Sequence, residues 1–253
     1  MAPVGMARLL ARFAIVGTLA LLSRTALLVE WSPPAFNDGD LAMAALTEGG
    51  PRTLNVTADA AALDEMLRGA NGRIDRWRKA PELVVLTSIM DYDVGDPMAH
   101  TASADQLTAK DAEELVADLT TGLAVLTDNT FQRFAAVHHE RATPGAKVHV
   151  VRHGQIVVGR YRDVRARLKT IGLGGRRSRS DGTITGGTVV LDHDFDSTSP
   201  RRKLLRIHEL GHAIGYNHVS SHVSIMNPEI GPDVSEFDRA AIRLAFEPTR
   251  PGF

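Results

Sequence analysis

Apolar side chains recur three and four positions apart in two stretches of the chain, which is the spacing of an amphipathic helix. The first stretch follows Thr108 and Asp111, which form a helix-start signal, and it should end near Asn129 and Thr130. Its apolar positions are Leu115, Val116, Leu119, Leu123 and Leu126. We therefore expect a long helix from position 108 onward.

A second amphipathic stretch lies near the C-terminus. We expect this helix to run from Ser235 to Phe246, with Asp238 completing its start signal. Its apolar face consists of Phe237, Ala241, Ile242 and Ala245. Further upstream, Ser199 suits the N-cap of another helix, and Pro200 suits its first position, where the missing N–H costs nothing.

Shorter apolar runs predict β-strands. The runs predicted to be single strands are residues 82–89, 168–173 and 183–192. Two further runs, 147–152 and 155–161, are separated by His153 and Gly154 and predict a hairpin. The polar, glycine-bearing segment 174–182 is expected to be a loop. The mixture of predicted strands and helices indicates an α/β (α+β) fold.

The N-terminus is typical of an export signal. Arg8 and Arg12 precede an apolar run from Phe13 to Leu22, which is too short to span a bilayer and fits the core of a signal peptide. We therefore expect an exported protein, extracellular or periplasmic, whose mature form starts beyond Leu22. The sequence offers no good small-x-small cleavage site, so two alternatives stay open: a membrane-bound signal anchor and a buried N-terminal helix.

Composition divides the chain into three parts. Residues 1–31 hold the export signal or anchor, and residues 32–80 begin with a linker rich in proline and glycine. Helix-like spacing over residues 58–79 indicates a short pro-region or a packing arm. Residues 81–253 form the main domain.

The bulk composition narrows the chemistry. The chain has 253 residues, a formal net charge of −1 and 43% hydrophobic residues, as expected of a globular protein with one core domain plus extra segments, or with two small domains. This balance gives no sign of a nucleic-acid partner. The chain has no cysteine, so any metal site must rest on His, Asp or Glu.

The strongest chemical signal is the sequence HELGHAIGYNH at positions 208–218. His208 and His212 lie four positions apart, so on a helix their imidazoles project from one face and could bind one ion. Glu209, the next residue, would act on a water at that ion as the catalytic base. Gly215 can take the left-handed conformation that ends a helix and would bring His218 back as a third ligand. Three histidines with one open position are typical of a catalytic zinc site.

This pattern, when a Met-turn follows it, resembles the metzincin zinc peptidases. The Met-turn candidate is SIMNP, whose Met226 lies eight residues after the third histidine. The resemblance implies that this methionine forms an apolar floor beneath the metal. Pro228, the strand GGTVVLDHDF and a closing helix with Asp238 and Phe246 are similar to the matrixins and their bacterial relatives.

The resemblance covers roughly residues 75–248 and implies a metzincin-like catalytic domain. Such a domain has a mixed twisted β-sheet, a long packing helix, an active-site helix and a C-terminal helix. The implied reaction is hydrolysis of a protein or peptide at one zinc ion, with Glu209 taking a proton from water and passing it to the leaving amine. The substrate would lie extended against an edge strand, for which residues 168–173 are the candidate.

Three features depart from the matrixin pattern. Val219 stands where matrixins usually have serine. Ile230 stands where many of them place a tyrosine in the pocket wall, so the substrate pocket is expected to differ. The absence of cysteine excludes the cysteine-switch latency of many matrixins.

Several weaker signals have two interpretations each. Asp192, Asp194 and Asp196 alternate, as suits either a calcium site or a polar turn before a helix. Residues 160–179 hold eight basic residues and one acid, as suits either an anionic partner or a solvated loop. Five further histidines have no clear ligand spacing, although a second metal site is a further option: His138, His139, His149, His153 and His222.

His222 also follows Gly215, but four more residues would carry it away from the metal, so we expect it on the rim of the site.

Two other functions share the predicted ligands. One is a catalytically silent zinc module that binds a protein or polymer, and the other is a zinc hydrolase that does not act on peptides. Contact with a membrane is expected only if the N-terminal segment is an uncleaved anchor.

Overall fold

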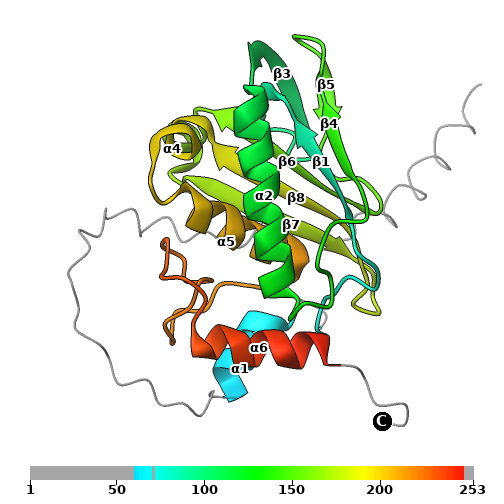
Figure 1. Cartoon of the computed structure of the whole chain (residues 1–253), viewed down its shortest axis with the longest axis vertical. Coiled ribbons are helices and arrows are strands. Elements are labelled where there is room, and N and C mark those ends of the chain that lie inside the picture. The colour runs from blue at the N-terminus through cyan, green and yellow to red at the C-terminus, as the bar shows by residue number, and fades with distance from the viewer. Residues whose placement is uncertain (1–59, 70–71, 248–253) are drawn as a thin grey trace, which may run out of the picture. The chain divides into compact units, whose positions relative to one another are not determined.

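The protein, seen in a computed structural model, is described over residues 60–69 and 72–247, which form an eight-stranded mixed sheet with six helices (Figure 1). This architecture confirms the α+β class. The strands are β1 (Glu82–Leu86), β2 (Ser88–Asp91), β3 (Ala99–Gln106), β4 (Val137–Glu140), β5 (Lys147–His149), β6 (Gln155–Arg162), β7 (Gly172–Ser178) and β8 (Ile184–Asp192). The helices are α1 (Ala60–Leu67), α2 (Ala109–Leu126), α3 (Val164–Leu168), α4 (His193–Thr198), α5 (Arg202–Ile214) and α6 (Glu236–Phe246).

Strand β6 lies inside the sheet. It pairs in parallel with β1 and β2 along one side and with β8 along the other. On the far side of β1 and β2, the sheet continues through β4, which is parallel to β1, and through antiparallel β3 and β5. At the opposite end, β7 pairs antiparallel with β8 and with no other described strand. Strand β7 is therefore an edge of the sheet.

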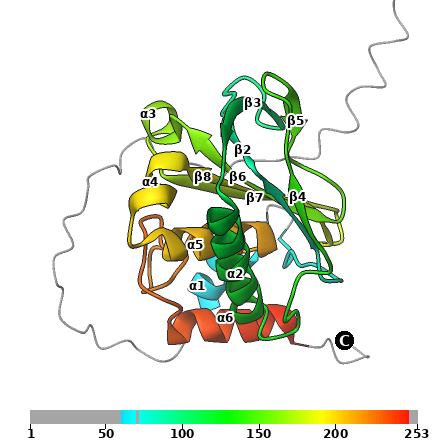
Figure 2. The same cartoon turned by 45° about the horizontal axis from the view of Figure 1, so that its top comes forward.

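The two faces of the sheet carry separate apolar clusters, because successive side chains of a strand point to opposite faces. Leu83 and Val85 pack with the apolar residues of α2 and α5, whereas Val84 and Leu86 pack on the opposite face. Figure 2 shows α2 and α5 together on one side of the sheet, with α1 and α6 beyond them. The larger cluster therefore supports the helix that carries the histidine motif.

Two predicted helices are confirmed together with their start signals. The Thr108 hydroxyl accepts a hydrogen bond from the Asp111 amide at the start of α2. Ser235 and Asp238 form a capping box at the start of α6. The predicted strand 183–192 is also confirmed as β8. These elements combine strong periodicity with a local capping signal, which is the pattern that sequence alone reports best.

The predicted hairpin of residues 147–152 and 155–161 is wrong. Strand β5 pairs with β3, and β6 pairs with β1, β2 and β8, so the two strands are not neighbours. Both sides of β6 are occupied by parallel partners, a non-local arrangement that a short Gly-containing turn does not reveal. The predicted strand 82–89 is split into β1 and β2 at Thr87, whose carbonyl accepts from the Leu107 amide.

The strand predicted at 168–173 and the loop predicted at 174–182 are also corrected. Helix α3 occupies Val164–Leu168, and β7 runs from Gly172 to Ser178. The glycines of β7 are needed because α5 lies directly against the strand: a Cβ at Gly174 would lie 2.2 Å from the Glu209 carbonyl oxygen. Glycine in this segment signals close approach of a helix, which a sequence pattern does not distinguish from a loop.

The predicted start of the motif-bearing helix is two residues too early. Ser199 is the C-cap of α4, and its hydroxyl accepts from the Arg201 amide. Helix α5 begins at Arg202, with Arg201 at the N-cap position and no side chain capping it. The expected strand-to-helix connection therefore contains an additional short helix, α4, whose N-cap is Asp192.

The predicted export segment 1–31 and the first part of the predicted linker, up to residue 59, lie outside the described residues. Within the helix-like segment 58–79, α1 is followed by an extended stretch that bridges Arg76 to Thr183. Met66 and Trp77 from this segment belong to the main core cluster. Among the described helices, none is both long and apolar enough to cross a membrane.

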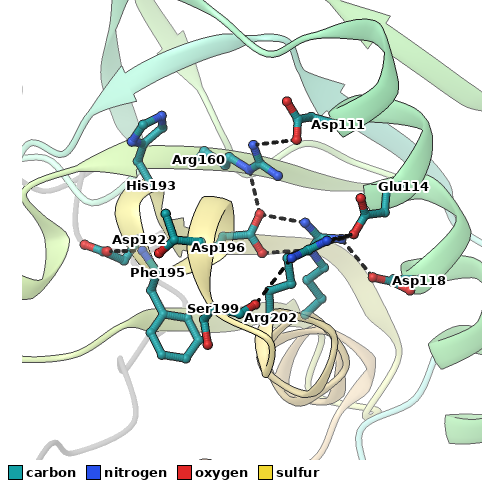
Figure 3. A network of polar contacts seen from close by, with 12 residues as sticks. Asp111, Glu114, Asp118, Arg160, Asp192, His193, Phe195, Asp196, Ser199 and Arg202 are labelled. Carbon is teal, nitrogen blue, oxygen red and sulfur yellow. Dashed lines mark hydrogen bonds and ion pairs between the residues drawn. The ribbon is translucent and has the colours of Figure 1, made fainter.

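A buried ionic network joins α5 to α2, α4 and β6 (Figure 3). The fully buried Asp196 carboxylate accepts hydrogen bonds from Arg160 Nε at 2.6 Å and from Arg206 Nε and Nη2 at 2.7 and 2.9 Å. Arg206 also donates to Asp118 at 2.8 Å, and Arg160 lies 3.4 Å from Asp111. Because Arg206 comes two residues before the motif, the network fixes the start of the motif-bearing helix.

We expect Asp196→Ala to lower the free energy of unfolding by about 3 kcal/mol or more, because it leaves two buried guanidinium groups without their shared partner. Urea denaturation followed by circular dichroism measures the change. Asp194→Ala is the matched control, since its side chain is 96% exposed, and it should leave the unfolding midpoint where it is. Equal midpoints for both variants would contradict the assigned role of the network.

Candidate metal centre

Three histidine side chains meet at the end of α5. His208 and His212 lie one turn apart on this helix, and His218 follows in the next loop. The His218 Nε2 atom lies 3.2 Å from His208 Nε2 and 3.1 Å from His212 Nε2. Among the described residues, these three form the only group of three or more His, Asp or Glu side chains whose ligand atoms all lie within 4.8 Å of one another.

The outer nitrogens of two rings are held by backbone carbonyls. His208 Nδ1 lies 2.6 Å from the Ile225 oxygen, and His212 Nδ1 lies 2.8 Å from the Tyr216 oxygen. A carbonyl can only accept a hydrogen bond, so Nδ1 carries the proton in both rings. A neutral ring protonated at Nδ1 presents a lone pair at Nε2, which is the atom turned toward the other histidines. This tautomer and ring orientation are the ones that a metal-binding histidine requires.

The spacing of the three Nε2 atoms suits a zinc ion. Zn–N bonds of about 2.05 Å in tetrahedral geometry place two ligand nitrogens about 3.3 Å apart. The distances from His218 to the other two rings, 3.2 and 3.1 Å, are close to this value. Three lone pairs directed at one point repel one another unless a cation lies between them. The donor set therefore fits a first-row divalent metal with a fourth position open.

Burial keeps all three rings neutral. Desolvation lowers the pKa of His208 and lowers that of His212 well below its ordinary value; the neighbouring histidines lower the pKa of His212 further. Burial, with a smaller contribution from His208, lowers the pKa of His218 to about 4. Only neutral imidazole can ligate a metal, so the buried site is prepared for ligation without first losing protons.

Glu209 lies beside the histidines and is only 4% exposed. Its Oε2 atom is buried and has no hydrogen-bond partner among the described residues. Burial raises the pKa of its carboxyl well above the ordinary value, and a nearby cation would act in the opposite direction. A Cβ at Gly172 of β7 would lie 2.4 Å from Oε1, so the edge strand approaches this carboxylate closely only because it has no side chain there.

Met226 packs beneath the motif-bearing helix. A Cβ at Gly211 would lie 2.5 Å from the Met226 sulfur, so the glycine inside HELGH is what lets the methionine come so near. Met226 is fully buried, and its carbonyl accepts from the Val219 amide, which closes the loop between the third histidine and the methionine. Met226 therefore lies directly against the helix that carries His208 and His212.

Asp238 has a second role that its helix-start signal does not reveal. Besides capping α6, its buried carboxylate accepts hydrogen bonds from the Ser224 hydroxyl and from the Ile225 amide, the latter at 2.9 Å. Ile225 in turn offers the carbonyl that holds His208. The first turn of α6 is thus connected to a histidine of the cluster through one residue. In the sequence, the capping signal explains Asp238 fully, so nothing there indicates this connection.

Gly215 and Tyr216 shape the loop before the third histidine. Gly215 ends α5 with φ = 135°, a positive value as predicted although outside the left-handed helical region. Tyr216 is buried and its hydroxyl donates to the Leu126 carbonyl at the end of α2. His222 lies apart from the cluster and stacks on Phe237 at a centroid distance of 4.5 Å. The structure therefore brings His218, and not His222, to the other two histidines.

The predicted aspartate group does not converge. Asp192 caps α4 and also accepts from the Arg165 amide, Asp196 is bound by two arginines, and Asp194 is exposed. Protein groups thus bind two of the three carboxylates and the third is exposed, which suits the alternative of a polar turn before a helix. Asp192 caps α4 and the side chain of Asp196 is buried, whereas Asp194 faces solvent. The packing of α4 therefore gives the three aspartates different environments that the sequence does not distinguish.

The basic segment 160–179 is not one continuous surface. Arg160 is buried in the ionic network, whereas Arg176 is paired with Asp75 at 2.8 Å. The other histidines without ligand spacing lie outside the cluster, and all four are exposed: His138, His139, His149 and His153. Val219 is buried, and Ile230 packs against the core while its carbonyl accepts from Arg201.

No protein-family model matches the chain, and no curated protein matches it either.

We expect His218→Ala to weaken zinc binding by more than 100-fold, because outer partners of metal ligands alone are worth 10- to 100-fold. His222→Ala is the matched control and should bind zinc like the wild type, since His222 stacks on Phe237 away from the cluster. Competition with a chromogenic chelator measures both affinities. Loss of zinc from the His222 variant with retention in the His218 variant would overturn this assignment.

The lowered pKa of His218 predicts that the metal-free protein loses stability in mild acid. The unfolded chain takes up a proton near pH 6.5, whereas the folded chain resists it until about pH 4, so stability is complete above 6.5 and falls as the pH drops between these values. From this residue alone the loss reaches about 3 kcal/mol. Denaturant titrations at pH 7 and pH 4 measure it, and His218→Gln should reduce the loss. An unchanged loss in that variant would refute the assignment.

Proposed function

We propose that the protein is a zinc-dependent endopeptidase of the metzincin type, most similar to the matrixin-like group. The observation that carries this proposal is the meeting of three Nε2 lone pairs from His208, His212 and His218, beside a buried carboxylate with a free oxygen. A structural zinc site usually closes with a fourth protein ligand, whereas three histidines leave a position for water or substrate. The methionine under Gly211 supports the metzincin type.

The chain's residues would divide the work of hydrolysis between them. The three histidines would hold one zinc ion, which when bound supplies Lewis acidity for activating water and polarising a carbonyl. Glu209 would accept a proton from the attacking water and later donate it to the nitrogen of the leaving amine. The free, buried Oε2 atom suits this role, because a carboxylate already occupied by protein donors could not take up the proton as readily.

The edge strand β7 is the proposed support for the substrate, in place of residues 168–173. It has no partner among the described strands on the side away from β8, so an extended peptide could add to the sheet there. Its first residue, Gly172, lies against the Glu209 carboxylate. A peptide held along β7 would therefore pass the base and the three histidines, as endopeptidase cleavage requires.

A catalytically silent zinc module is the alternative. It shares the metal ligands but gives no reason for a buried carboxylate next to them, and its suggested binding segment 160–179 is partly buried in ion pairs. The exported location, a further proposal, rests on residues 8–22. Cleavage of denatured casein, with and without a chelator, separates the peptidase from the silent module.

We expect Glu209→Ala to retain one zinc per chain and to lose at least 10²- to 10⁴-fold in turnover, because the base is removed while the ligands stay. Casein cleavage and metal content, measured on the same sample, test both parts. The matched control is Glu113→Ala, which removes an exposed glutamate of α2 and should leave both values unchanged. Casein cleavage by Glu209→Ala at the wild-type rate would exclude this mechanism.

A further inference from the structure

The residue before the third histidine, Asn217, donates hydrogen bonds to three backbone carbonyls at the end of α1. Its backbone amide donates to the Met66 carbonyl at 2.8 Å, and its side-chain Nδ2 donates to the carbonyls of Arg68 and Glu65 at 2.7 and 3.2 Å. All three acceptors belong to the last turn and end of α1, where carbonyls have no partner inside a helix. Asn217 therefore caps α1 from a loop about 150 positions away.

The side-chain oxygen of Asn217 makes the remaining contact. It accepts from Arg176 Nη2 at 3.1 Å, and Arg176 lies on the edge strand β7. The Nε atom of the same guanidinium donates to Asp75 at 2.8 Å, and Asp75 is only 6% exposed. One arginine thus ties the third-histidine loop to both β7 and the segment that follows α1.

The segment of residues 72–77 also presses on the end of the motif-bearing helix. A Cβ at Gly215 would lie 2.3 Å from the Asp75 carbonyl oxygen, so the turn at this glycine is covered by the segment. The buried Trp77 donates through Nε1 to the Ala213 carbonyl at 2.9 Å. Arg76 pairs with the start of β8 through its amide and carbonyl. The segment therefore surrounds the turn through which the chain returns to the cluster.

We propose that residues 60–69 and 72–77, here named the arm, are a clamp for the third metal ligand, and that Asn217 is the positioning residue through which the clamp acts. Among the hydrogen bonds of the described residues, none joins Asn217 to a histidine of the cluster, so Asn217 acts through its neighbour His218. Its donors and acceptor fix the backbone on the N-terminal side of His218, while the Val219 amide bound to Met226 fixes the other side. The third ligand is therefore held from both directions.

The contacts of the arm bear on the predicted pro-region in the N-terminal part of the chain. A pro-region is removed when a peptidase matures, but removal of the arm would expose the Asn217 donors and the Trp77 site on α5. The arm therefore belongs to the working domain, and any processing has to occur before Ala60. The inference rests on the proposed function only through the metal site, and it does not require peptide hydrolysis.

The test compares Asn217→Ala and Asn217→Asp in the full-length protein. The aspartate keeps the oxygen that accepts from Arg176 but loses the Nδ2 donors. Its second carboxylate oxygen would face the carbonyl oxygens of Arg68 and Glu65 and be repelled by them. We expect both variants to bind zinc 10- to 100-fold more weakly than the wild type, the range typical of outer partners of metal ligands. Glu113→Ala, which removes an exposed side chain of α2 outside the arm, is the control and should keep the wild-type affinity.

A second readout needs no metal. Hydrogen exchange of the amides of residues 217–219 in the metal-free protein should be faster by about tenfold or more in both Asn217 variants, because local opening no longer has to break the two Nδ2 hydrogen bonds to the arm. Wild-type zinc affinity in folded Asn217 variants would overturn the proposal, since a purely structural residue would lower only global stability. Unchanged exchange in the loop would overturn it as well, whether or not the wild type cleaves casein.

Discussion

Three imidazole rings can face one another in a buried site only if their inward nitrogens carry no protons, and much of this structure serves that requirement. Desolvation disfavours the charged form of each ring. The backbone carbonyls of Ile225 and Tyr216 accept hydrogen bonds from the Nδ1–H groups of His208 and His212. The Nε2 lone pairs of these two rings are then directed toward the centre of the cluster. Both carbonyls come from loops, so the tautomers of His208 and His212 depend on how those loops are fastened. A cation then completes an arrangement that the protein has already oriented.

Three separate sets of hydrogen bonds hold these loops and the helix that carries His208 and His212. Asp238 at the start of α6 holds the turn that presents Ile225, and the Asp196 network holds the start of α5. Asn217 holds the loop of His218 against the arm. In each set, a charged or amide side chain forms hydrogen bonds with backbone or guanidinium groups. Burying those groups without a partner would cost free energy. The loops and the helix of the site are therefore held by hydrogen bonds between polar groups that lie far apart in the sequence.

Close approach is the second constraint, and glycine meets it. Gly172 and Gly174 let β7 lie directly against the helix that carries Glu209 and His212, and Gly211 lets Met226 reach the underside of that helix. In all three places a methyl group would overlap an atom of the site. The same glycines clear the face of β7 toward α5, which brings the edge strand of the sheet next to the Glu209 carboxylate.

The sequence by itself determined the elements whose signals are local. Capping at Thr108 and Ser235, the apolar spacing of α2 and α6, and the fourfold spacing of His208 and His212 all involve residues within one or two helical turns. The choice of His218 over His222 also followed from the glycine turn. Only the tertiary structure decided the partners of β5 and β6, the glycine-rich strand β7, the ion pairs of Asp196 and the clamp on Asn217. Those features join segments tens to more than a hundred residues apart, and a side chain's partner across such a distance leaves no periodic trace in the chain.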